Sequence, residues 1–81
     1  MVITIRLFAR LREIAGASEL ERRVSEGATA RTAWDQLVIE FPALGDYARA
    51  VSCAVNEEYA RLTTPLKEGD EVAFLPPVSG G

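Results

Sequence analysis

One long amphipathic helix constrains the fold of this chain more than any other feature of its sequence. Between residues 30 and 41, apolar side chains recur every three or four positions, which places them on one face of a helix. Thr29 is a suitable N-cap, because its hydroxyl can accept a free backbone N–H of the first turn. Pro42 ends the segment, since proline cannot continue the helix and biases Phe41 away from helical geometry. The helix therefore needs a second layer against which its apolar face can pack.

The segments around this helix alternate between apolar and polar residues, which is typical of strands with one buried face. We predict strands at residues 2–9, 19–24, 51–55, 59–62 and 71–75. The first two are expected to pair in antiparallel fashion. Residues 10–15 are compatible with a short helix that Gly16 ends, and residues 43–50 are irregular or form a short helical turn. Turns are expected at residues 25–27, 56–58 and 66–70, the last with a positive φ at Gly69.

The order strand, strand, helix, strand, short strand, strand indicates the α+β class. In particular, it is the order of the β-grasp or ubiquitin-like fold, in which a mixed, mostly antiparallel sheet packs on one main helix. A chain of 81 residues fits one domain. We assign residues 1–75 to the β-grasp domain and residues 76–81 to a flexible, extended C-terminal tail. So small a domain has little room for an enclosed active site, which favours a binding or carrier role over an enzyme.

The composition excludes several kinds of chemistry within this chain. It contains no histidine and only one cysteine, Cys53. An internal disulfide, a zinc site and a Ser–His or Cys–His catalytic pair are therefore excluded, and we expect no metal and no cofactor. Cys53 alternates with Val51 and Val55, so buried packing is the expected role of its side chain.

Charge and hydropathy argue against nucleic-acid and membrane partners. The formal net charge is −3, the arginines are dispersed, and Lys67 is the only lysine. A nucleic-acid-binding protein would usually show a concentrated basic patch. No apolar run approaches the roughly 20 residues that span a bilayer. Residues 1–8 lack the pattern of a secretory signal, so we expect a cytoplasmic protein.

The last six residues, Pro76-Pro77-Val78-Ser79-Gly80-Gly81, differ from the rest of the chain. Two prolines favour an extended path, and glycines without a Cβ can pass a narrow channel. At about 3.3 Å per residue, the segment reaches on the order of 20 Å beyond the last strand. It is therefore long enough to place the unhindered carboxylate of Gly81 in the active site of another protein. Because chain ends are often small and disordered, two glycines alone would equally fit a frayed terminus.

Side-chain alternation also predicts an exposed apolar patch beside this tail. If Ile3, Ile5 and Leu7 face the helix, then Phe8 faces away from it, and Leu75 likewise faces away. The first and last strands of a β-grasp sheet are neighbours. Phe8 and Leu75, with Tyr59 as a weaker candidate, are thus predicted to form a partner interface. The alternative is that these side chains only cover the edge of the sheet.

Three stretches carry a resemblance to a known family: residues 7–16, residues 55–58 with 64–74, and residues 76–81. The chain resembles the small, sulfur-carrying subunit of molybdopterin synthase. The resemblance implies that an ATP-dependent activating enzyme adenylates the carboxylate of Gly81. A sulfur donor, such as a cysteine desulfurase or a rhodanese-like protein, then replaces AMP and leaves a thiocarboxylate.

The same resemblance implies roles for the partners and for the rest of the tail. The tail that carries the thiocarboxylate enters the large catalytic subunit, where its sulfur passes to cyclic pyranopterin monophosphate. Gly80 then gives clearance, Pro76, Pro77, Val78 and Ser79 position the tail, and the catalytic groups belong to the partner. Three alternatives remain: a carrier for tRNA thiolation or thiamine synthesis, a ubiquitin-like protein modifier, and an interaction module with an inert tail.

Overall fold

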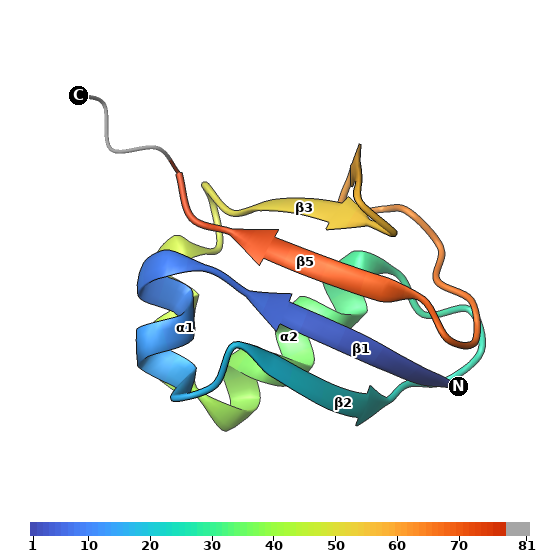
Figure 1. The fold of residues 1–81 in the computed structure, drawn as a ribbon, viewed down its shortest axis with the longest axis horizontal. Coiled ribbons are helices and arrows are strands. Elements are labelled where there is room, and N and C mark those ends of the chain that lie inside the picture. Colours follow the sequence, from blue (N-terminus) through green and yellow to red (C-terminus); the bar gives the residue numbers. More distant parts are fainter. Residues whose placement is uncertain (78–81) are drawn as a thin grey trace.

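A computed structural model describes residues 1–77, which form one mixed five-stranded sheet with a helix across one face (Figure 1). The elements are β1 (Val2–Leu7), α1 (Ala9–Ala15), β2 (Glu19–Arg23), α2 (Ala30–Glu40), the 3₁₀ helix η1 (Pro42–Tyr47), β3 (Ser52–Val55), β4 (Glu58–Ala60) and β5 (Glu71–Leu75). The strand order is β2-β1-β5-β3-β4. Only the central pair, β1 with β5, is parallel within this region. The predicted α+β, β-grasp fold is confirmed.

The helix α2 forms for the local reasons that its sequence indicates. Thr29 accepts a hydrogen bond from the backbone N–H of Thr32, and the Thr32 hydroxyl accepts one from the backbone N–H of Thr29, so a capping box closes the first turn. At the other end, Phe41 leaves helical geometry and Pro42 begins η1. The expected short helical turn after α2 is therefore a 3₁₀ helix.

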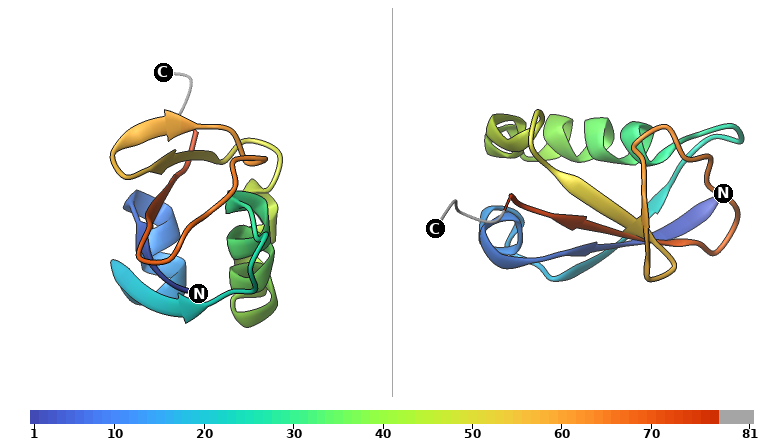
Figure 2. Two further views of the ribbon diagram at one scale, coloured as in Figure 1. Left: turned by 90° about the vertical axis from the view of Figure 1, so that its right-hand side faces the viewer. Right: turned by 90° about the horizontal axis from the view of Figure 1, so that it is seen from above.

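The core lies between α2 and the sheet, as the two layers in Figure 2 show. Trp34 from α2 packs on Phe74 from β5, with ring centroids 5.1 Å apart and planes inclined at 58°. The strands contribute Ile3, Ile5 and Leu7, which are almost fully buried, as their alternation predicts. The opposite face of the sheet has no helix over it within residues 1–77 and is open to solvent.

Several predicted strand boundaries are wrong by one or two residues. β1 stops at Leu7 because Phe8 becomes the N-cap of α1, whose first residue, Ala9, has a φ of 51°. β4 begins at Glu58 rather than at residue 59, because a two-residue turn joins it to β3. Asn56 and Glu57 form this turn with φ values of 52° and 71°. A two-residue hairpin turn of this kind requires positive φ at both positions.

Candidate functional site

The chain leaves the sheet from its central strand, between two neighbours. Phe74 is registered against Leu7 of β1, and Leu75 against Ser52 of β3. Pro76 is half-buried and Pro77 is exposed, and neither can donate a backbone hydrogen bond to a further ladder. The helix α1 lies beside this exit (Figure 1). The base of the tail is thus fixed on a rigid element.

The rest of the predicted tail lies outside the described residues. These positions are Val78, Ser79, Gly80 and Gly81. The structure places Pro76 and Pro77 where the sequence predicts them, directly after β5. The carboxylate chemistry assigned to Gly81 therefore remains a prediction.

A shallow cavity of about 230 Å³ lies on the open face of the sheet next to the exit. Phe8, Tyr59 and Leu75 all line it, so the structure brings together the three residues that the sequence nominates. Phe8 is 38 % exposed and Tyr59 is 83 % exposed. We call these three residues the apolar patch. Its geometry suits an interface, while its role in binding remains a prediction.

The hollow arises from one row of side chains across four strands. In register order this row is Arg6, Ala73, Ala54 and Tyr59, so two small residues lie between two large ones. The alanines form a low floor, and the larger side chains at either end form walls. Alternation alone places Ala73 on the face away from the helix. The register between strands, which the sequence does not reveal, is needed to place Ala54 and Tyr59 beside it.

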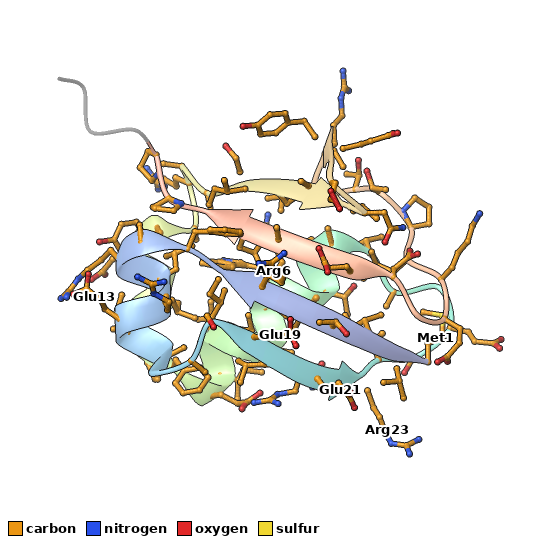
Figure 3. The ribbon with its side chains drawn as sticks, in the orientation of Figure 1. Met1, Arg6, Glu13, Glu19, Glu21 and Arg23 are labelled. Carbon is orange, nitrogen blue, oxygen red and sulfur yellow. The ribbon has the colours of Figure 1, made fainter. Side chains whose placement is uncertain are left out.

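Arg6 adds a charged wall that the sequence prediction missed. Its guanidinium lies over the ring of Phe8, 5.5 Å from the centroid, and its Nη1 is 3.7 Å from Oε1 of Glu71. In Figure 3 Arg6 lies over the open face of the sheet, near the C-terminal end of β1. A guanidinium stacked on an aromatic ring loses less conformational freedom on binding than a free one. The hollow therefore combines the apolar patch with one oriented cation, the guanidinium of Arg6.

The other reactive residue types have structural explanations. Cys53 is buried, its thiol donates to the carbonyl oxygen of Ala60 at 3.3 Å, and burial raises the pKa of that thiol. The expected packing role is confirmed, and a reactive thiolate is disfavoured. Glu57 and Glu58 are exposed and lie in or beside the hairpin turn.

The described part of the chain offers neither a metal site nor a membrane-spanning helix. Among residues 1–77, no group of three or more His, Cys, Asp or Glu side chains is arranged to hold a metal ion. No helix in this region is long and apolar enough to cross a bilayer.

A single helix across a five-stranded mixed sheet, with the chain leaving from the central strand, defines a ubiquitin-like β-grasp protein. The chain belongs to the ThiS family, whose model matches residues 5–81.

Known proteins similar to this chain cover nearly its whole length. The molybdopterin synthase sulfur carrier subunit of Arabidopsis thaliana is 39 % identical over 98 % of this chain and 82 % of its own length. Small archaeal modifier protein 1 of Haloferax volcanii is 38 % identical over 94 % of this chain and 97 % of its own. Among solved structures, a putative molybdopterin converting factor, subunit 1, from Pyrococcus furiosus aligns with a TM-score of 0.84. It is 30 % identical, covering 96 % of this chain and 99 % of that one.

Proposed function

We propose that this chain is the sulfur carrier subunit of a molybdopterin synthase. The observation that carries the proposal is the position of the tail. The family match runs through to Gly81, and the tail starts at the central strand of the sheet, beside an apolar hollow. An apolar patch next to the start of the tail suits delivery of the end of the tail into a partner.

In the proposed chemistry, a carboxylate oxygen of Gly81 attacks the α-phosphorus of ATP on an activating enzyme, and pyrophosphate leaves. The product is an acyl-adenylate. The outer sulfur of a persulfide on a donor, such as a cysteine desulfurase or a rhodanese-like protein, attacks the acyl carbon, and AMP leaves. The product is an acyl disulfide between Gly81 and the donor. A second thiol attacks the donor's sulfur, so the two thiols form a disulfide and Gly81 leaves as a thiocarboxylate. Each charged tail supplies one sulfur, so the dithiolene of one molybdopterin requires two deliveries to cyclic pyranopterin monophosphate.

Within this proposal the residues of the chain bind and position the tail. The apolar patch docks on the large catalytic subunit, Pro76 to Ser79 direct the tail, and Gly80 leaves room around the reacting group. The acid and base groups come from the partner, because this chain has no histidine and its one cysteine is buried. All these steps belong to the cytoplasm.

A protein modifier is the second candidate, and the Haloferax volcanii relative named as a modifier favours it. A lysine amine of a target would then attack the same adenylate, or a thioester derived from it. The products separate the two functions, because a carrier yields a thiocarboxylate and a modifier yields amide-linked adducts. Carriers for tRNA thiolation or thiamine synthesis share the thiocarboxylate and differ only in the acceptor.

Deletion of Gly80 and Gly81 tests the proposal. In a reaction reconstituted with the activating enzyme, the sulfur source and the large subunit, the shortened chain is expected to yield no molybdopterin. Its melting temperature should equal that of the full chain, because the core lies within residues 3–74. Molybdopterin formation by the shortened chain would overturn the proposal.

A further inference from the structure

Positive charge at the exit of the tail comes from arginine. Arg10 lies in the first turn of α1, which follows directly after the Leu7–Phe74 pairing of β1 with β5. Arg49 lies in the turn that leads into β3, three residues before Ser52. Both side chains are exposed, and Nη1 of Arg10 lies 3.2 Å from Oε1 of Glu13 in the same helix. Arg10 follows β1 and Arg49 precedes β3, and these are the two strands that border β5.

The only lysine lies at the other end of the sheet. Lys67 is held in the turn before β5, where its backbone N–H donates to Asp70 Oδ2 at 2.8 Å. The same turn is tied to the start of β1, because the N–H of Gly69 donates to the carbonyl oxygen of Val2 at 2.8 Å. Arg23, registered against Val2, also lies at this end, as Figure 3 shows.

The length of β5 separates this lysine from the reacting group. From Glu71 to Pro77 the extended chain covers about 20 Å, and Lys67 lies a further turn beyond. The four residues after Pro77 reach about 13 Å at full extension. That length is shorter than the path from Pro77 back to Lys67 along β5, whereas Arg10 and Arg49 are each three residues from a strand end that is registered against Phe74 or Leu75.

The distinction matters because the two basic side chains differ as nucleophiles. A guanidinium stays protonated, whereas a lysine amine loses its proton readily enough to act as a nucleophile in proteins. A neutral ε-amine that attacks an activated acyl carbon forms an amide, expels the leaving group and releases a proton. A lysine near the exit would thereby form an amide with Gly81 of its own chain, and the tail could no longer carry sulfur.

We propose that Arg10 and Arg49 keep the charge around the exit in a form that an activated Gly81 cannot acylate, which protects the carrier from self-capture. The inference rests on the proposed function, in which the end of the tail is activated. In this account the two arginines set the specificity of the activated tail for acceptors on other molecules. The identity of arginine at these positions matters, and not only its charge.

The test uses the full chain made as a C-terminal thioester of a small thiol, so that activation does not depend on an enzyme. Arg10→Lys and Arg49→Lys keep the charge and introduce an amine near the exit, and Arg23→Lys introduces the same amine at the far end as a matched control. The tail tethers its thioester to the amine of the same chain at an effective concentration of about 1 mM. At a protein concentration of about 10 μM, amide formation within one chain should therefore be roughly 100-fold faster than amide formation between chains. Intact mass and peptide mapping follow the products.

Both exit variants are expected to form an internal amide, one water lighter than the free acid, at a rate independent of protein concentration. The unchanged chain and Arg23→Lys are expected only to hydrolyse. The proposal is overturned if the exit variants also only hydrolyse while millimolar free lysine captures their thioesters, or if the unchanged chain forms an internal amide at Lys67. Failure of the proposed function would instead show as the absence of enzyme-made thiocarboxylate, which this experiment does not involve.

Discussion

Truncation of Tyr59 tests whether the apolar patch is the docking surface. We expect Tyr59→Ala to weaken binding to the large catalytic subunit of molybdopterin synthase and to leave the fold intact. A tyrosine side chain presents about 150–250 Å², and 83 % of Tyr59 is exposed. A partner that covered half of the exposed part would remove on the order of 80 Å² from water, which at about 25 cal/mol per Å² is about 2 kcal/mol. The dissociation constant should therefore rise roughly 30-fold.

Isothermal titration calorimetry measures this change, and Ile39→Ala provides a matched control. Ile39 is 81 % exposed, almost as much as Tyr59, but it lies on α2, across the sheet from the patch. Its truncation removes a similar exposed apolar group and should change the affinity less than twofold. Thermal unfolding checks that both variants remain folded. An unchanged affinity for Tyr59→Ala, or an equal loss for Ile39→Ala, would refute the assignment of the patch.

Three further predictions concern the body of the domain. Because burial raises the pKa of the Cys53 thiol, iodoacetamide at pH 8 should leave the native protein unmodified and alkylate it in urea; rapid native alkylation would contradict this. Thr29→Ala removes the capping box with Thr32 and should lower the free energy of unfolding by about 1 kcal/mol in urea titrations. Arg22 donates two hydrogen bonds to Glu40, and these bonds lower the pKa of the Glu40 carboxyl from its ordinary value of 4.5. A lowered folded-state pKa contributes stability above the unfolded value that is lost as pH falls through the folded one. Since the pair is partly exposed, Glu40→Gln should lower the free energy of unfolding by less than about 1 kcal/mol at pH 7. The variant should also lose less stability than the unchanged chain as the pH falls below about 4.5. An identical dependence of stability on pH in this acid range would count against the prediction.

Local sequence signals predict α2 and the turns well. The cap at Thr29, the stop at Pro42, the end of α1 at Gly16 and the positive φ of Gly69 each depend on a few neighbouring residues. The alternation in β1 likewise identifies its buried face, because one slip in register would expose every core side chain of the strand. The element order then follows from the sequence.

Features that depend on the pairing of distant segments could not be predicted. The sequence predicts a turn at residues 56–58 but not its backbone geometry, because Glu57 has a φ of 71°, which a glutamate side chain disfavours. The floor of the hollow requires the register of β3 against both β5 and β4. The orientation of Arg6 depends on Phe8 and Glu71, which only the folded chain brings around it.

The central claim is that Gly81 is activated and loaded with sulfur. Intact-mass spectrometry tests it most directly, after incubation of the chain with ATP, the activating enzyme and a sulfur source. The account predicts a mass increase equal to the replacement of one oxygen by sulfur, mapped to Gly81 and absent when ATP is omitted. An unchanged mass with an active enzyme, or amide adducts to lysines of other proteins in place of the thiocarboxylate, would contradict it.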